Sequence, residues 1–410
     1  MNNFKKRLEA QLRPRAVVLS LVACLVLTIG CRRTVIDKKD LRDFQQVNLV
    51  ANNGKYNPKL TDTTLRNAWG LAFSSNGIAW VNSMSGHVSE LYTAEGAIAR
   101  APVKIPSPAD TVGGLPTGIV FSSGKGFKIS NGQASLFLFV GVDGILSGWN
   151  GAANTRALVV KNNSATSSYT GLALASNGGA NYIYAANFRT GKIDVWDTTF
   201  AAVSMPFRDP GLPAGYAPFN IQAVGSWLYV QYAKVGSDGR DQAGAGNGFV
   251  DIYNTDGSFV KRFASRGSLN APWGVAMAPA GWLQSKDMAD DNGQDNGDNH
   301  GGNNNSGPGN NNGNNSGPGS NNSGRGGHDF DANQPVILIG NFGDGRINVF
   351  TMDGTYQGQL QSHNRTIVID GLWALSFAPS TATTVDPNRL YFTAGPDKEA
   401  DGVYGYLIKQ

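Results

Sequence analysis

The stretch Trp69-Gly70-Leu71-Ala72-Phe73, followed after a short turn by Ile78-Ala79-Trp80-Val81-Asn82, is the unit from which this chain is built. A small or aromatic residue and a glycine open an apolar strand, and a second strand follows. The glycine position recurs at 118, 171, 220, 274 and 374, although Asn220 and Ala374 stand there in two copies. A repeat of about 50 residues is typical of one propeller blade. The sequence therefore predicts an all-β, six-bladed β-propeller with four-stranded blades.

The two ends of the chain complete this prediction. Most copies show a third strand with alternating apolar residues, such as 193–197 and 249–253, and hairpin turns then lead to a fourth. The sixth copy ends with a third strand at 403–408, while the strand-like run 44–50 precedes the first copy. We expect residues 44–50 to complete the sixth blade, because this closes the ring and removes exposed sheet edges.

Composition agrees with many short strands joined by glycine-rich turns. The 410 residues include 53 glycines, and only 16% of the chain is charged. These values exclude a coiled coil and a helical bundle, and 2 cysteines are too few for a disulfide scaffold.

The amino terminus resembles an export signal. Basic residues precede the apolar stretch 16–29, which is too short to span a bilayer and ends at Gly30-Cys31. We predict a lipoprotein-type signal over 1–31, lipidation of Cys31 and a tether over 32–43. The protein would then be exported and lipid-anchored in the cell envelope, at the outer membrane or in the periplasm. Ordinary secretion is the alternative.

Removal of the signal changes the charge. Residues 1–30 carry five basic side chains and one acidic side chain, so the formal net charge falls from +4 to 0 without them. This balance excludes a general nucleic-acid or anionic-membrane surface.

Residues 284–331 interrupt the predicted propeller, which spans 44–410. They hold 13 Asn, 12 Gly and 7 Asp and almost nothing apolar. Such a segment buries too little surface to offset ordering entropy, so we predict a disordered insert between the first two strands of blade five.

Several segments carry a resemblance to two known families. Residues 271–276 and 339–350 resemble an NHL-type propeller repeat. Residues 70–73, 139–150 and 244–251 resemble a family of exported bacterial six-bladed propellers with no assigned activity. The resemblance implies the fold and export but no reaction.

The candidate binding face follows from strand direction. Adjacent antiparallel strands place the start of each innermost strand beside the end of the second strand, at one mouth of the channel. Amide and indole groups gather there, and they suit a neutral polar ligand, a glycan or a protein partner. The alternative is that they cap turns and pack between blades. The predicted mouth residues are Asn67, Trp69, Asn82, Thr117, Asn187, Asn220, Gln231, Trp273, Asn341, Asp370 and Trp373.

No catalytic constellation is apparent in the sequence, so a monomeric, non-catalytic binding module without a cofactor is the leading hypothesis. The alternative is a calcium-dependent hydrolase or lyase of the lactonase-like propeller type. Its oxygen ligands would come from Asp370, Asn341, Asn220 and Asn187. A third possibility is a scaffold for spacing or adhesion. The long polar hairpin 234–247, with Asp238, Arg240 and Asp241, is either a functional loop or a solvated one.

Overall fold

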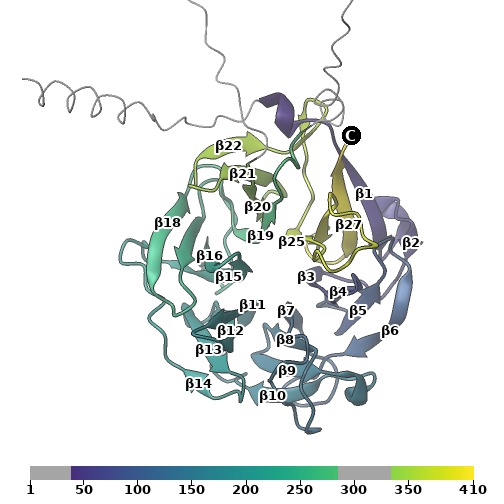
Figure 1. Ribbon diagram of the computed structural model, residues 1–410, viewed down its shortest axis with the longest axis vertical. Coiled ribbons are helices and arrows are strands. Elements are labelled where there is room, and N and C mark those ends of the chain that lie inside the picture. Colours follow the sequence, from purple (N-terminus) through teal and green to yellow (C-terminus); the bar gives the residue numbers. More distant parts are fainter. Residues whose placement is uncertain (1–37, 285–333) are drawn as a thin grey trace, which may run out of the picture. The chain divides into compact units, whose positions relative to one another are not determined.

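Six antiparallel sheets are arranged around a central channel in the computed structural model, which describes residues 38–284 and 334–410 (Figure 1). Each sheet is one blade, and the first strand of each blade lies innermost. Blade one contains β3 (Ala68–Phe73), β4 (Ala79–Ser83), β5 (Val88–Tyr92) and β6 (Ile98–Lys104). Blade two contains β7 (Pro116–Phe121), β8 (Phe137–Gly141), β9 (Ile145–Trp149) and β10 (Leu158–Asn162).

The next three blades repeat this order. Blade three contains β11 (Tyr169–Asn177), β12 (Ala180–Asn187), β13 (Lys192–Asp197) and β14 (Ala202–Val203). Blade four contains β15 (Tyr216–Val224), β16 (Trp227–Lys234), β17 (Phe249–Tyr253) and β18 (Phe259–Ser265). Blade five contains β19 (Pro272–Ala278), β20 (Val336–Asn341), β21 (Ile347–Thr351) and β22 (Tyr356–Gln359). A short hairpin, β23 (Gln361–Ser362) and β24 (Arg365–Thr366), leads to blade six.

Blade six joins the two ends of the chain. It contains β25 (Leu372–Phe377), β26 (Leu390–Ala394), β27 (Val403–Lys409) and, as its fourth strand, β1 (Phe44–Ala51). Strand β1 pairs antiparallel with β27 from Phe44↔Lys409 to Ala51↔Val403. The short β2 (Leu60–Thr61) adds a parallel fifth strand. The predicted six-bladed fold and its closure by an N-terminal strand are thus confirmed.

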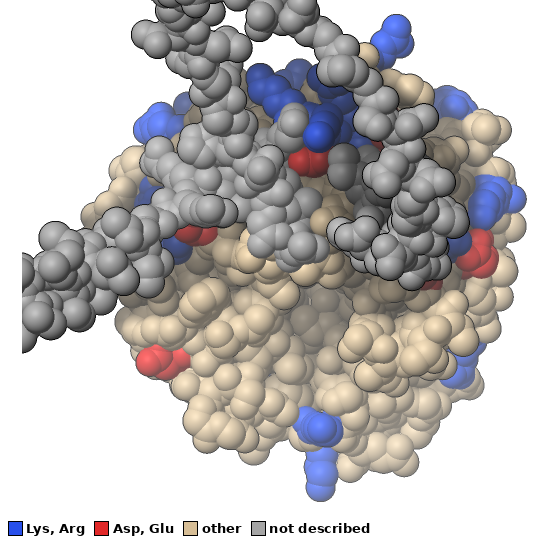
Figure 2. Space-filling model, turned by 45° about the horizontal axis from the view of Figure 1, so that its top comes forward, with Lys and Arg blue, Asp and Glu red and all other residues tan. Residues whose placement is uncertain are grey.

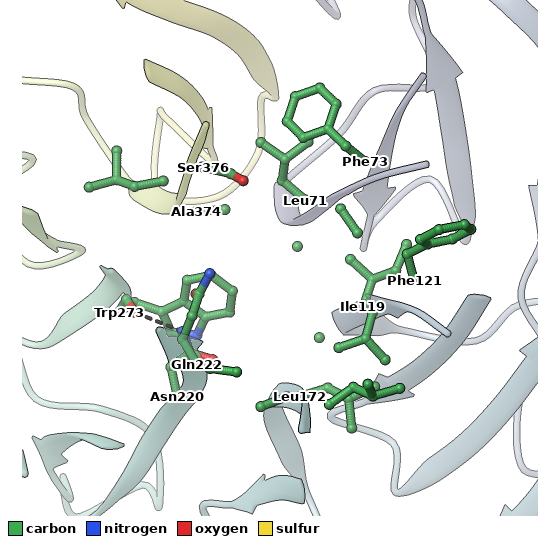
Figure 3. Close-up of a pocket in the computed structure, with 18 residues that line it drawn as sticks. Leu71, Phe73, Ile119, Phe121, Leu172, Asn220, Gln222, Trp273, Ala374 and Ser376 are labelled. Carbon is green, nitrogen blue, oxygen red and sulfur yellow. Dashed lines mark hydrogen bonds between the residues drawn. The ribbon is translucent and has the colours of Figure 1, made fainter. Parts of the chain in front are cut away.

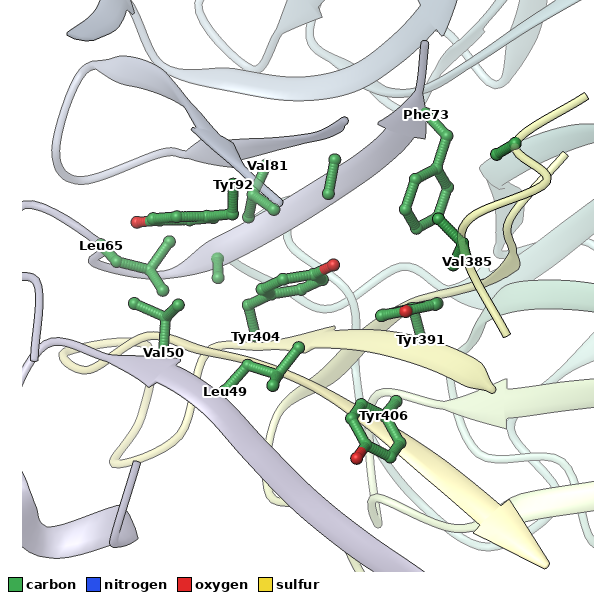
Figure 4. Close-up of a cluster of buried hydrophobic side chains, with 13 residues drawn as sticks. Leu49, Val50, Leu65, Phe73, Val81, Tyr92, Val385, Tyr391, Tyr404 and Tyr406 are labelled. Carbon is green, nitrogen blue, oxygen red and sulfur yellow. The ribbon is translucent and has the colours of Figure 1, made fainter. Parts of the chain in front are cut away.

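A hydrophobic cluster stabilises the closure (Figure 4). Leu49 and Val50 of β1 are fully buried, and they share this cluster with Tyr404 of β27 and Tyr92 of blade one. The rings of Tyr92 and Tyr404 stack with their centroids 5.8 Å apart. Side chains from both ends of the chain therefore share one core with blade one, so that burial of apolar surface holds the ring closed.

Burial within a blade explains its sequence pattern. Every residue of β4 and β5, the two middle strands of blade one, is buried, whereas most of β6 is exposed. Middle strands are covered on both faces by the neighbouring blades, so they are mostly apolar. The outer strand borders solvent and accepts polar residues.

The recurring glycine has a steric cause. A Cβ atom on Gly70 would lie 2.1 Å from the carbonyl oxygen of Thr117, and one on Gly118 would lie 2.5 Å from the backbone nitrogen of Leu172. Both contacts are shorter than any van der Waals separation. The innermost strands of neighbouring blades approach so closely that a side chain does not fit.

Chain direction gives the ring two distinct faces. The innermost strands begin at one of these faces, which we call the mouth face. The connection into each innermost strand and the hairpin between the second and third strands both lie on this face, because neighbouring strands are antiparallel. The connections between first and second strands lie on the opposite face. Gln284 and Gln334, which border the segment outside the described residues, belong to that opposite face.

A candidate binding pocket at the channel mouth

Most of the predicted mouth residues are buried rather than open to solvent. Asn67, Asn82 and Gln231 have no exposed surface, and Trp373 is 1% exposed. Asp370 alone among the predicted set is exposed. These side chains therefore form the inner wall of the ring, and their hydrogen bonds show what they do there.

Several of them connect one blade to the next. The Nδ2 atom of Asn82 donates to the carbonyl oxygen of Thr117 at 3.0 Å. The hydroxyl of Thr117 in turn donates to the carbonyl oxygen of Tyr169 at 2.7 Å. Asn220 Nδ2 donates to the carbonyl oxygen of Trp273 at 2.7 Å. These bonds satisfy buried carbonyl groups on the innermost strands and join blades one to two, two to three and four to five.

Two further bonds continue this inter-blade set. The hydroxyl of Thr393 on blade six donates to the carbonyl oxygen of Trp69 on blade one. The indole nitrogen of Trp273 donates at 2.9 Å to the carbonyl oxygen of Thr170, on blade three. The polar groups of the inner wall thus hold neighbouring blades together through bonds to backbone carbonyls, a role that neither sequence hypothesis described.

Asn187 and Asn341 instead bind groups of their own blades or of the connections that lead into them. Asn187 Nδ2 donates to Ser167 Oγ at 3.0 Å and to Asp194 Oδ2 at 2.9 Å. Asn341 Nδ2 donates to the carbonyl oxygen of Ser268 at 2.8 Å. Gln231 differs, because neither polar atom of its buried side chain has a partner among the described residues.

An aromatic cluster fills the channel near the mouth face. Trp373 lies between Trp69 and Phe342, with ring centroids 3.5 Å and 3.9 Å away and both pairs stacked. Trp273 packs edge-on against Trp373 at 5.9 Å, and Phe219 lies 5.8 Å from the same ring. These five side chains form what we call the aromatic plug. Trp273 lines a cavity on one side of the plug, and Trp69 and Phe219 line another.

The first cavity is the channel itself, with a volume of about 260 Å³ (Figure 3). Leu71, Ile119 and Leu172 of the innermost strands project into it, and Gln222 adds a polar group. The channel wall thus presents polar as well as apolar surface, because backbone groups, Asn220 and Ser376 also line it. On the face shown in Figure 2, Lys and Arg side chains gather toward the edge, and uncharged residues surround the central hollow.

The second cavity, which we call the mouth pocket, has a volume of about 300 Å³. It is lined by Trp69, Met84, Val142, Ser168, Thr170, Phe188, Phe219, Gly239, Arg240, Asp241 and Glu399. The hairpins between second and third strands of five blades contribute to it, from Met84 on blade one to Glu399 on blade six. Apolar and aromatic walls with a few convergent charged groups are typical of small-molecule sites.

The charged groups of the mouth pocket come from two blades. Arg240 lies in the long hairpin between β16 and β17, and its Nη2 donates to Glu399 Oε1 at 2.6 Å. Glu399 lies between β26 and β27, and its other oxygen accepts from Asn67 Nδ2 at 2.9 Å. Asn67 also accepts from the indole nitrogen of Trp373 at 2.8 Å. One hydrogen-bonded chain therefore runs from the aromatic plug to the hairpin of blade four.

Asp241 completes the charged set and is electrostatically different from Glu399. Its carboxylate makes no hydrogen bond or ion pair with any other described residue, apart from its own backbone. Burial, with a further contribution from the charge of Glu399, raises the pKa of Asp241 to about 6. As far as the described residues show, the pocket therefore holds one carboxylate with side-chain partners, Glu399, and one without, Asp241.

The residues considered for calcium are hydrogen-bonded to separate parts of the structure. Asn187 Oδ1 accepts from the backbone nitrogen of Ser168, and Asn341 Oδ1 accepts from that of Asn270. Asp370 accepts from the backbone nitrogen of Asp397. Across residues 38–284 and 334–410, these side chains and Asn220 share no hydrogen-bond partner, and no group of three or more His, Cys, Asp or Glu has a geometry that could hold a metal ion. Asn187, Asn341 and Asp370 thus each already accept a backbone hydrogen bond.

Some sequence predictions concern parts of the chain that the structure does not describe. The signal over 1–31, Cys31 and most of the 284–331 insert lie outside the described residues. Among the described residues, no helix has the length and apolar character needed to cross a membrane.

Sequence reasoning missed Glu399 and Phe188, which lie in hairpins, and it also passed over Phe219 on the innermost strand β15. It searched the innermost strands and the ends of the second strands, whereas the mouth pocket is built mainly by the following hairpins. Strand direction could have indicated them, since these hairpins lie on the same face as the starts of the innermost strands. The hairpin of blade four was singled out for its length, and Arg240 and Asp241 within it do line the pocket.

These features define a six-bladed β-propeller with an aromatic plug and a pocket at one channel mouth. No protein-family profile matches the chain. It is 30% identical over 381 residues to uncharacterized protein L690 of Acanthamoeba polyphaga mimivirus, covering 89% of this chain and 86% of that protein. It is 29% identical to uncharacterized protein R648 of the same virus, and the match covers 94% of this chain and 84% of that protein. The chain belongs to the family of these proteins.

Solved structures with a related chain path have low sequence identity. A streptogramin B lyase has 11% identity and a TM-score of 0.46, covering 90% of this chain and 97% of that chain. A hydrazine synthase of Kuenenia stuttgartiensis has 13% identity and a TM-score of 0.39, and the match covers 81% of this chain and 74% of that chain. The predicted membership in an exported bacterial propeller family with NHL-like repeats stays a prediction, because the relatives named above are viral.

Proposed function

We propose that the chain is a non-catalytic binding module that takes a small polar ligand in the mouth pocket. The mouth pocket carries this proposal, because aromatic walls and three charged side chains converge in a preformed cavity of about 300 Å³. That volume is at the lower end for ligand sites, so a small molecule or a single sugar unit fits better than a broad protein surface.

The position of the pocket supports binding by a rigid frame. Its lining residues follow strands that are joined by inter-blade hydrogen bonds. The stacked rings of the aromatic plug pack beside them. A preformed site loses little conformational entropy when a ligand binds, so a small cavity can still give useful affinity.

A cavity-filling variant tests the proposal. Val142 lines the mouth pocket, and Val142→Trp should occupy it. Val159→Trp is the matched control, since Val159 is 43% exposed on the outer strand of the same blade. A library of small polar and aromatic compounds would be screened by ligand-observed NMR. We expect compounds that bind the wild type and the control but not Val142→Trp. A screen in which every hit binds Val142→Trp equally well would refute the mouth pocket as the site.

We also propose that the protein is exported and held in the cell envelope by a lipid on Cys31. The basic and apolar order of residues 1–31 supports this proposal. Mass spectrometry of the mature amino terminus should find a lipidated cysteine, and Cys31→Ser should release the protein from the membrane fraction. An unmodified terminus upstream of Cys31 would contradict it.

A further inference from the structure

We propose that the mouth pocket recognises an organic cation, an alkylated or quaternary ammonium group that lies against the aromatic walls beside Asp241. This inference deepens the proposed function and rests on it. It names the chemical class of the ligand. The aromatic and the charged residues of the pocket together support this class.

The balance of charges in the pocket is the first argument. Arg240, Asp241 and Glu399 sum to one negative charge. Glu399 is fully engaged, since one of its oxygens accepts from Arg240 and the other from Asn67. Arg240 is in turn directed to Glu399. Among the described residues, the charge left without a hydrogen bond or ion pair is therefore the carboxylate of Asp241, which Arg240 attracts only through space. A monovalent cation would neutralise it.

The aromatic walls are the second argument, and they are independent of the first. Trp69, Phe188 and Phe219 line the same cavity as Asp241. Aromatic rings attract ammonium groups through their quadrupole, and this attraction grows when water is excluded. A carboxylate beside several rings is the arrangement that recognises alkylated ammonium groups, because the rings contact the methyl groups while the carboxylate balances the charge.

Burial of Asp241 favours the same ligand. Desolvation raises the pKa of this carboxyl to about 6, so its charged form is costly in the empty pocket. A bound cation would compensate that cost and lower the pKa again. An anionic ligand would increase the cost of the charged form, since its charge would add to those of Asp241 and Glu399.

A neutral sugar is the main competitor, because sugars also stack on aromatic rings and hydrogen-bond to carboxylates. The indole nitrogen of Trp69 is buried and has no partner among the described residues, so it does not by itself distinguish the two ligands. Charge does distinguish them. A cation and a neutral molecule of the same shape should bind differently only if the unpaired carboxylate recognises charge.

The test uses choline, its uncharged isostere 3,3-dimethyl-1-butanol, and glucose, each titrated into the full-length protein by calorimetry and NMR. We expect choline to bind at least about tenfold more tightly than either neutral compound. Asp241→Asn should weaken choline binding by about tenfold or more and leave the neutral isostere unchanged. Asp110→Asn is the control, since Asp110 is exposed and does not line the pocket.

The outcomes separate this inference from the proposed function. The proposal of a cationic ligand would be refuted by any of three results. These are equal binding of choline and its isostere, choline binding that Asp241→Asn leaves unchanged, and no binding of choline at all. If glucose or another neutral compound then binds the wild type but not Val142→Trp, the mouth pocket remains a binding site with a different ligand. If no compound depends on Val142, the proposed function itself fails.

Discussion

Arg240 on blade four donates a hydrogen bond of 2.6 Å to Glu399 on blade six, and this ion pair joins two blades that are not neighbours in the ring. The Arg240 side chain is 63% exposed, whereas that of Glu399 is 19% exposed. An exposed ion pair contributes only about 0.2–1 kcal/mol to stability. Its importance lies in position, since it fixes the long hairpin of blade four beside the mouth pocket.

Breaking this pair should loosen the hairpin without unfolding the ring. In Arg240→Gln we expect faster hydrogen exchange across residues 234–247 and a change in melting temperature of no more than a few degrees. Arg189→Gln is a suitable control, because Arg189 is exposed in the corresponding hairpin of blade three. Unchanged exchange in the hairpin would show that other contacts hold it.

Asp241→Asn should stabilise the ligand-free protein in a pH-dependent way. Burial raises the folded-state pKa of Asp241 to about 6, above its unfolded value, so the ionised carboxylate lowers stability as the pH rises through that range. At pH 8 the variant should gain about 1–3 kcal/mol in the free energy of unfolding. At pH 4 the folded-state carboxyl is protonated and the unfolded-state carboxyl is about half protonated, so the gain should largely disappear. Urea unfolding at the two pH values measures this, and an equal gain at both would contradict the prediction.

Close approach of the innermost strands makes Gly70 sensitive to substitution. Gly70→Ala should lower the free energy of unfolding by about 1–3 kcal/mol, because the new methyl group would clash with the Thr117 carbonyl. Gly54→Ala is the control, since a Cβ atom there meets nothing within 4 Å. Denaturant unfolding of both variants measures the difference. A Gly70→Ala protein as stable as the control would mean that the blades can separate at no cost.

Closure of the ring by β1 is testable by truncation. A chain that begins at residue 53 loses Leu49, Val50 and Ala51, all of which are fully buried. It also exposes the edge of β27, so we expect a lower melting temperature and aggregation. A chain that begins at residue 38 retains β1 and should melt as the full-length protein does. Thermal melts followed by light scattering would measure both, and equal melting of the two truncated chains would disprove a stabilising role for β1.

The calcium alternative has its own test. Because the oxygen atoms of Asn187 and Asn341 already accept backbone hydrogen bonds, we expect about 10 mM calcium to leave the melting temperature unchanged. Metal analysis of the purified protein provides a second readout. A calcium-dependent rise in melting temperature that Asp370→Ala abolishes would instead support the hydrolase or lyase alternative.

Much of the inner wall was predictable in composition but not in role. The repeats identify Asn82 and Asn220 as polar residues near the channel mouth, which is where they lie. Their partners are backbone carbonyls of the next blade, and sequence alone does not reveal that these carbonyls need donors. That need arises only when two innermost strands approach closely enough to exclude water.

The sequence by itself determined the number of blades, the order of their strands and the closure by residues 44–50, because these follow from a local period and from the cost of an open sheet edge. Only the tertiary structure decided the mouth pocket. Asn67, Arg240 and Glu399 are far apart in the chain and meet because the closed ring brings hairpins of separate blades to one face. The same convergence places the half-buried Asp241 in a cavity with aromatic walls, where its carboxylate has no side-chain partner among the described residues, and no local pattern encodes a desolvated charge.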